Sequence, residues 1–251
     1  MFRRTFTSLL LVGRFWTAAG VNARLPRVPV LTKNGNPKLD ANGKPLTISP
    51  TTKLDKDRPV EQMSWCPGFP MLIKDRLVVD GGWIERKGVT CFNHYRPPRI
   101  QPGDANKAGP WIEHIHRIYP EEANHIISWL AHRVQRPAEK INHALVLGGS
   151  QGIGKDSLLE PVRYAVGPWN FKDVNPGNLL GRFNSFAKAV VLRVNEARDL
   201  GDAADRVNRF TFYDHTKQYI VTPPETTRID EKTPSRILHF QRDWFSNHHQ
   251  P

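Results

Sequence analysis

The chain has 251 residues, 39% of them hydrophobic, which is enough for a buried core in one large domain or in a smaller domain with an appended module. Thirty-six Lys and Arg against 24 Asp and Glu give a formal charge of +12, which is typical of a protein with a polyanionic partner such as nucleic acid. Solvated surface charge is the alternative, and the charge alone does not decide between the two. No stretch approaches the ~20 apolar residues of a membrane-spanning helix, so we expect no membrane span.

The N-terminal 39 residues contain no Asp or Glu, and an apolar run at residues 9–12 follows two arginines. Arg14 ends this run short of the about 7 to 15 apolar residues of a secretory signal. Cys66 and Cys91 are the only cysteines, and neither has a neighbouring cysteine with which to bind a metal. We therefore expect a cytoplasmic protein with reduced thiols and no structural zinc site.

Two Asn-Gly pairs within residues 31–46 are strong tight-turn signals and predict a surface hairpin or loop. Residues 58–110 mix Pro, Gly, Trp and short apolar runs, which favours short strands and turns over long helices. We accordingly divide this part of the chain into a poorly defined N-terminal segment at 1–58 and a small accessory region at 59–110.

The clearest helix is predicted over residues 121–135. Its apolar residues recur at the three-and-four spacing of one helical face, and Pro137 follows the last of them. We expect this helix to pack on the domain that follows it.

Residues 144–157 predict a buried strand that leads into a phosphate-binding loop. The apolar run at 141–147 has the length of a strand, and residues 155–166 have apolar positions spaced for one helical face. Pro161 is expected to kink or shorten that helix. The spacing of Gly149, four residues, Gly154 and Lys155 is that of a loop whose backbone N–H groups cradle phosphates. An ordinary strand-to-helix turn is the alternative.

This pattern predicts ATP and Mg²⁺ as ligands. The pattern expects Ser or Thr directly after Lys155 to bind Mg²⁺, but Asp156 stands there and Ser157 follows, so either side chain is a candidate metal ligand. The predicted nucleotide-binding residues are Gly149, Ser150, Gln151, Gly152, Ile153, Gly154, Lys155, Asp156 and Ser157.

A second apolar strand is predicted over residues 189–196, and it ends in a carboxylate. Glu196 is the candidate group that activates water for attack on the γ-phosphate, and it is also a candidate Mg²⁺ ligand; Lys155 is its catalytic partner. A surface glutamate at a strand end is the alternative. Asn195 precedes it where a second acid would strengthen metal binding.

Several segments together resemble the ATPase domain of phage-type primase–helicases, within the superfamily 3 helicases that include the poxvirus-type enzymes. The resemblance covers about residues 110–238, and the stretch upstream from about residue 60 resembles the region before that domain. The segments that carry it are residues 148–157, 181–186, 195–201, 212–217 and 222–232. In this family an Asp after the loop lysine is common.

The resemblance implies an α/β P-loop NTPase core of RecA/AAA-like type at residues 111–240, with a helical element before it and a small mixed N-terminal region. It implies a ring of identical subunits in full-length relatives, ATP-driven movement on single-stranded DNA during bacteriophage DNA replication, and a fused or separate primase-polymerase module. Lys217, Arg228 and Lys232 fall where the family has basic contacts to DNA. For each, a surface role is the alternative.

The family also has a further strand that ends in a sensor Asn and is followed by an arginine finger. No matching sequence is found after residue 239. Residues 241–251 form a divergent tail, and we expect poor hydrolysis, since an arginine finger is worth about 10³ to 10⁵ in rate. Three hypotheses follow: an ATPase module of a primase–helicase, a non-catalytic nucleic-acid-binding remnant of one, and a small-molecule P-loop kinase. Asp156 and the basic charge favour the first two.

Overall fold

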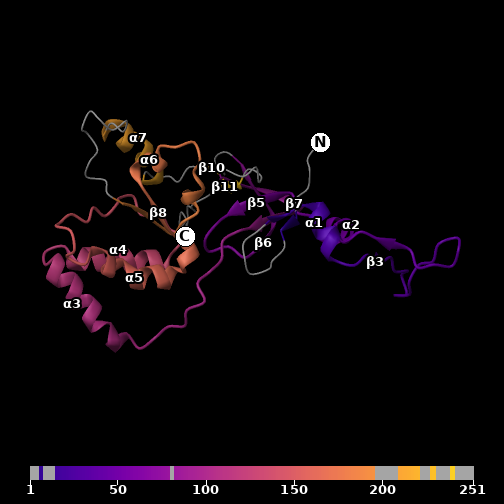
Figure 1. The fold of residues 1–251 in the computed structure, drawn as a ribbon, viewed down its shortest axis with the longest axis horizontal. Helices are drawn as coiled ribbons and strands as arrows, with labels where there is room; N and C mark the ends of the chain where they lie inside the picture. Colours follow the sequence, from indigo (N-terminus) through magenta and orange to yellow (C-terminus); the bar gives the residue numbers. More distant parts are fainter. Residues whose placement is uncertain are drawn as a thin grey trace, which may run out of the picture. The chain divides into compact units, whose positions relative to one another are not determined.

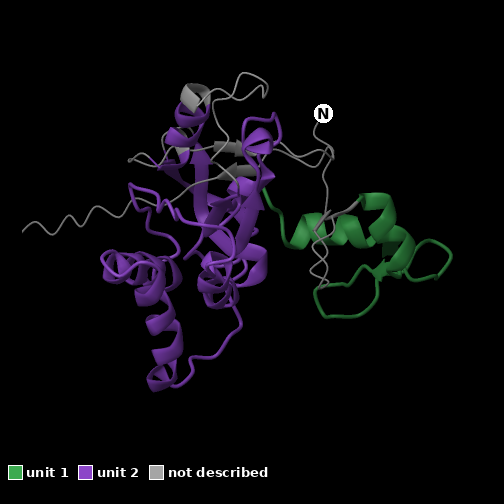
Figure 2. Cartoon of the chain, turned by 60° about the vertical axis from the view of Figure 1, so that its left-hand side comes forward, with its two compact units in different colours: residues 1–61 green, residues 62–251 purple. Residues whose placement is uncertain are grey.

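The computed structural model describes residues 6–7, 15–79, 82–195, 209–220, 227–229 and 238–240. The chain mixes helices with small sheets and divides into two compact units, residues 1–61 and 62–251 (Figure 2). The unit boundary lies close to the predicted division at residue 58. Among the described residues no helix combines the length and the apolar character needed to cross a bilayer.

The described part of the first unit has two short helices and two pairs of two-residue strands. Thr17 and Ser49 cap the two helices by accepting hydrogen bonds from backbone N–H groups in the first turns. The Asn22 side chain accepts from the backbone N–H of Thr51 at 3.2 Å and joins the helices. The elements are β1 (Phe6–Thr7), β2 (Phe15–Trp16), α1 (Ala18–Arg24), β3 (Val28–Pro29), β4 (Thr47–Ile48) and α2 (Pro50–Asp57).

Two tight turns between β3 and β4 confirm the prediction from the Asn-Gly pairs. Gly35 has φ +82° and donates to the carbonyl of Thr32, while Gly43 has φ +75° and donates to the carbonyl of Asp40. These are three-residue hairpin loops in which glycine takes the left-handed position.

A five-stranded sheet begins the second unit. Its strand order is β10-β11-β5-β7-β6, with β5 parallel to both of its neighbours and the other pairs antiparallel. The prediction of strands and turns over 58–110 is confirmed, although β7 is longer than expected. The strands are β5 (Gln62–Trp65), β6 (Leu72–Val79), β7 (Gly82–Asn93), β10 (Thr227–Ile229) and β11 (Leu238–Phe240).

Asn93, 1% exposed, ties the turn after β5 to the end of β7. Its side-chain oxygen accepts from the backbone N–H groups of Cys66 and Tyr95, and its amide nitrogen donates to the carbonyl of Cys66 at 2.8 Å. Cys66 and Cys91 are buried free thiols, and burial raises the pKa of Cys91. Buried polar groups must be paired, so this amide fixes the turn's conformation.

The remaining elements of the second unit are mainly helical, and α3, α4 and α5 lie together in Figure 1. They are η1 (Ala105–Ala108), α3 (Gly109–Ile118), α4 (Ala123–Gln135), α5 (Lys155–Val166), η2 (Pro168–Asn170), β8 (Phe171–Val174), α6 (Pro176–Leu179), η3 (Ser185–Ala187), β9 (Val191–Val194) and α7 (Arg209–Ile220).

The local predictions for this part are confirmed at α4, α5 and β9. Helix α4 begins two residues later than predicted, and Ala123, Ile126 and Leu130 on its apolar face are buried. Helix α5 continues through Pro161 and ends at Val166, so the proline does not shorten it. Strand β9 pairs in parallel with β8, which gives this unit a βαβ-like crossover next to α5.

The strand predicted over residues 141–147 was wrong. These described residues are irregular, and Val146 is 91% exposed. The carbonyl of His143 accepts a hydrogen bond from the Trp129 indole at 3.3 Å, and that of Gly148 accepts from the Tyr119 hydroxyl at 2.7 Å. Side chains of α4 and of the residue after α3 thus bind this segment where a neighbouring strand was expected. An apolar run forms a strand only where a partner strand is available.

Arg133 occupies a buried position on α4, although the helix pattern alone favours an apolar residue there. The residue is 4% exposed, and its guanidinium donates to the carbonyls of Val190, Pro137 and Glu139. The arginine therefore fastens the end of α4, the turn after it and the chain entering β9 to one another.

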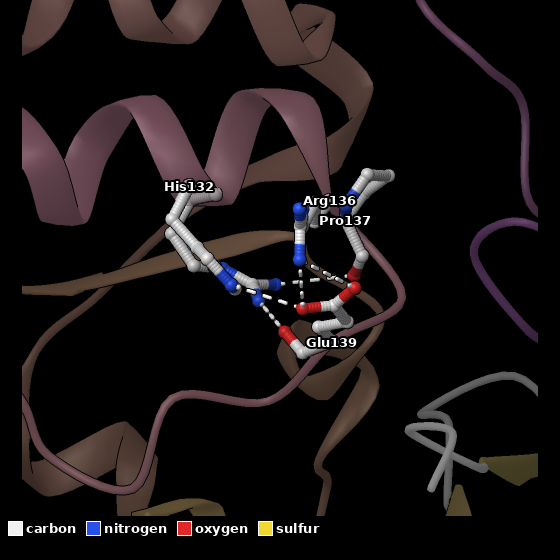
Figure 3. Close-up of polar contacts among 5 residues, drawn as sticks. His132, Arg136, Pro137 and Glu139 are labelled. Carbon is white, nitrogen blue, oxygen red and sulfur yellow. Dashed lines mark hydrogen bonds and ion pairs between the residues drawn. The ribbon is translucent and has the colours of Figure 1, made fainter. Parts of the chain in front are cut away.

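The Glu139 carboxylate pairs with two side chains on the exposed side of this turn. It lies 3.1 Å from His132 Nε2 and 3.3 Å from Arg136 (Figure 3). The side chains of Arg136 and Glu139 are both substantially exposed. This ion pair therefore contributes little stability compared with the hydrogen bonds of buried Arg133.

Replacing Arg133 with Met should lower the free energy of unfolding by about 3 kcal/mol, because several buried carbonyls lose their donor. The exposed control Arg136→Met should change it by less than about 0.5 kcal/mol. Urea unfolding measures both. Equal losses for the two variants would contradict the structural role assigned to Arg133.

Candidate functional site

The predicted phosphate-binding loop, residues 148–154, is a glycine-dependent turn that leads directly into α5. Gly149, Gly152 and Gly154 have φ values of +122°, +83° and +96°, which side chains other than glycine rarely adopt. Most of the loop is exposed, and no side chain caps the first turn of α5. Unoccupied N–H groups at a helix start favour anions, so the backbone suits phosphate groups.

Lys155 lies across this loop. Its Nζ donates to the carbonyls of Gly149 and Ser150, both at 2.8 Å. The ammonium group therefore sits within the curve of the loop, next to the backbone groups that would bind phosphates. A phosphate there would exchange carbonyl partners for more strongly bound charged oxygens.

Helix α3 braces both ends of the loop. Tyr119, which follows the last residue of α3, donates from its hydroxyl to the carbonyl of Gly148. His114 Nε2 lies 3.0 Å from the carbonyl of Gly154. Burial raises the pKa of Tyr119, which keeps the hydroxyl in its protonated, donating form.

The contact with Arg117 defines the tautomer of His114. An arginine NH2 group lies 2.7 Å from His114 Nδ1, and arginine can only donate, so Nδ1 accepts and Nε2 carries the proton given to Gly154. The imidazole also covers the α-carbon of Gly154, since a Cβ there would lie 2.6 Å from the ring. Glycine is therefore required both for its backbone angle and for the space.

The same face of α3 reaches the start of α5. The Trp111 indole donates to the carbonyl of Leu158 at 2.9 Å, and Ile115 between these polar contacts is fully buried. One face of the helix therefore carries all three side chains, because His114 and Ile115 lie three and four residues after Trp111. These bracing residues were missed by the sequence reasoning, although the aromatic and histidine residues at helical spacing were a usable signal.

Asp156, a predicted metal ligand, is held by an arginine. Its carboxylate lies 2.7 Å from Arg193 NH1, and Arg193 also pairs with Asp173. Arg193 further lies over the Phe171 ring, 5.8 Å from its centroid. This network links α5 to β8 and β9. The Asp156 carboxylate is therefore already paired with the Arg193 guanidinium.

Ser157 is exposed in the first turn of α5 and stays a predicted Mg²⁺ ligand. Within the described residues no group of three or more His, Cys, Asp or Glu side chains is arranged to hold a metal ion. Glu196 lies outside those residues, directly after the last described residue that follows β9. The donor set on the described chain therefore suits phosphates better than it suits a metal bound by protein groups alone.

The predicted DNA-binding residues are not gathered at the loop. Lys217 is exposed on α7, and Arg228 belongs to β10 at the edge of the five-stranded sheet, where it pairs in register with His239. Lys232 lies outside the described residues. Their assignment as DNA contacts stays a prediction.

Comparison with known proteins identifies no relative: no family model, curated protein or solved structure matches the chain.

Substituting Gly154 with Ala should destabilise the protein more than Gly152→Ala, whose added Cβ would meet no other atom within 4 Å. Both variants strain the backbone, at about 1 to 2 kcal/mol, but only the first forces the His114 ring to move. Removing the ring in the double variant Gly154→Ala/His114→Ala should recover part of the loss, with a coupling of about 1 kcal/mol. Thermal or urea unfolding of all variants measures this, and strict additivity would contradict the close contact.

Proposed function

We propose that the chain is an ATP-binding module of the phage-type primase–helicase class, with a P-loop NTPase core. The observation that carries the proposal is the loop itself: three glycines with positive φ lead into an uncapped helix start, and Lys155 Nζ lies across them. A fold that only needed a turn into α5 would not require a lysine across the loop or repeated left-handed glycines. The parallel β8–β9 pair beside α5 is compatible with such a core.

In this proposal the backbone N–H groups of residues 149–155 bind the phosphates, and Lys155 neutralises the terminal ones. Mg²⁺, when bound, would offset charge on the phosphate oxygens. Ser157 is the better placed of the two candidate ligands, because the Asp156 carboxylate would first have to leave Arg193. Asp156 and Arg193 instead position the first turn of α5 against β8 and β9.

The proposed role of ATP binding is movement on or unwinding of single-stranded DNA. The net charge of +12 supports a nucleic-acid partner, since phosphates release counterions when basic side chains bind them. Glu196 is proposed to activate the attacking water, and Lys217, Arg228 and Lys232 to contact the strand. A ring of identical subunits is proposed for the assembled form.

Lys155→Ala should abolish Mg·ATP binding, with at least about a hundredfold loss in affinity, because the loop loses the charge facing the terminal phosphates. Exposed Lys107→Ala on η1 is the matched control and should bind as the unaltered chain does. Equilibrium binding of a fluorescent ATP analogue measures both. If both variants bind equally well, or the unaltered chain binds no nucleotide, the ATP-binding proposal fails; phosphate release stimulated by single-stranded DNA would support the helicase role.

Ser157→Ala should raise the Mg²⁺ concentration needed for half-maximal nucleotide binding, whereas Asp156→Asn should leave that requirement nearly unchanged. The reason is that Asp156 is paired with Arg193, while the Ser157 hydroxyl is exposed beside the loop. Asp156→Asn should lower stability instead, by up to about 1 kcal/mol for this exposed carboxylate. The reverse order in Mg²⁺ titrations would make Asp156 the metal ligand.

A further inference from the structure

The basic charge of the chain is concentrated in its smaller unit. Residues 1–61 hold 11 Lys and Arg against four Asp and Glu, whereas residues 62–251 hold 25 against 20. More than half of the net charge therefore belongs to less than a quarter of the chain. The candidate ATP site lies wholly in the other unit, so its chemistry does not account for this excess.

Within this unit, residues 30–46 form a built structure, which we call the lysine ribbon. An eight-residue pattern occurs twice, at 30–37 and 38–45, each with Leu at its second position, Asn-Gly in its middle and Pro at its end. Each copy folds as one of the two hairpins, closed by the bridges between Leu31 and Pro37 and between Leu39 and Pro45.

The two hairpins and the residue before β4 are joined by a closed set of three backbone hydrogen bonds. Val30 donates to the carbonyl of Leu46 at 2.8 Å, Leu46 donates to Lys38 at 2.7 Å, and Lys38 donates to Val30 at 2.7 Å. Arg27 adds a guanidinium at the base of the ribbon, where it donates to the side chain and carbonyl of Thr47. The ribbon thus has a defined conformation without a hydrophobic core of its own.

Three lysines project from this ribbon, at positions 33, 38 and 44, and every residue from 31 to 46 is exposed. Among the described residues no carboxylate pairs with these lysines, in contrast to Lys53, which pairs with Asp57 at 2.9 Å. The one acid of the ribbon, Asp40, accepts from the backbone N–H groups of Asn42 and Lys44, both at 2.9 Å. Its carboxylate therefore serves the turn and leaves the lysines to an outside partner.

We propose that the lysine ribbon binds the phosphodiester backbone of nucleic acid. Lysines act as point charges toward phosphate oxygens, and the hydrogen-bonded ribbon presents Lys33, Lys38 and Lys44 as exposed charges to the backbone of a nucleic-acid strand. Residues 30–46 contain no aromatic side chain on which a base could stack, so the ribbon contacts phosphates without reading sequence. The proposal goes beyond ATP binding and uses none of the residues of that site.

An anionic membrane is the competing partner, and the structure favours nucleic acid over it. Peripheral membrane binding typically uses an amphipathic helix with bulky aromatic and aliphatic anchors, whereas the ribbon is a turn-based structure whose leucines alternate with polar residues. Vesicle binding is therefore included as an outcome of the test.

The test uses the full chain with Lys33, Lys38 and Lys44 changed to Gln. The matched control changes Lys74, Lys87 and Lys107 to Gln, three exposed lysines of the other unit that lower the net charge equally. Binding to a labelled single-stranded oligonucleotide of mixed sequence is measured by fluorescence anisotropy between about 50 and 200 mM salt. The ribbon variant should bind at least about tenfold more weakly, with the slope of log affinity against log salt reduced by about 2, since each phosphate contact contributes about 0.7.

The control variant should retain most of the affinity and slope. Equal weakening of both variants would show that only total charge matters, and unchanged binding by the ribbon variant would show that the ribbon makes no contact; either result overturns the proposal. Loss of binding to phosphatidylserine vesicles with unchanged oligonucleotide binding would overturn it in favour of a membrane. A parallel measurement on Lys155→Ala separates the two proposals, because that variant should lose ATP binding and keep oligonucleotide binding.

Discussion

The position of the candidate nucleotide loop depends on hydrogen bonds from side chains in or next to α3 and α4 to backbone carbonyls of the loop and of the segment before it. Tyr119 holds the carbonyl of Gly148, His114 holds that of Gly154, and Trp129 holds that of His143 further upstream. Because the described chain leading into the loop has no neighbouring strand, these contacts replace the ladder that a central strand would supply. Helix α3 therefore determines where the loop lies relative to α5.

This arrangement separates the anchoring of the loop from its proposed chemistry. The braces engage carbonyl oxygens, and the N–H groups at the start of α5 have no side-chain cap. Carbonyls facing the helices and N–H groups left for a ligand give the loop the polarity that an anion requires. The Asp156–Arg193–Asp173 network adds a second anchor from β8 and β9 and holds the first turn of α5 in place.

Local sequence patterns predicted the elements whose formation depends on nearby residues. The apolar face of α4, the apolar strand β9 and the two Asn-Gly turns could all be predicted, because periodicity and turn chemistry act over a few residues. The strand over 141–147 was predicted wrongly, since a strand requires a partner that the local sequence cannot specify. Burial of Arg133 was also unforeseen, because its acceptors at Pro137, Glu139 and Val190 are brought together only by the folded chain.

The glycines of the loop could be predicted for the same local reason, since their spacing before Lys155 reflects backbone angles. The partner of Asp156 could not, because Arg193 is 37 residues away on β9 and comes close to Asp156 only in the folded chain. Likewise, the bracing role of His114 depends on a contact with Gly154, 40 residues later. Long-range polar contacts thus set the details that decide which side chains remain available to a ligand.

Hydrogen exchange of the backbone N–H groups, measured with and without Mg·ATP, tests the central claim most directly. If residues 149–157 form a phosphate-binding loop, ATP should slow exchange there more than anywhere else in the chain, because phosphate oxygens take up those N–H groups. Unchanged exchange in this segment at saturating ATP, or protection confined to other parts of the chain, would contradict the account.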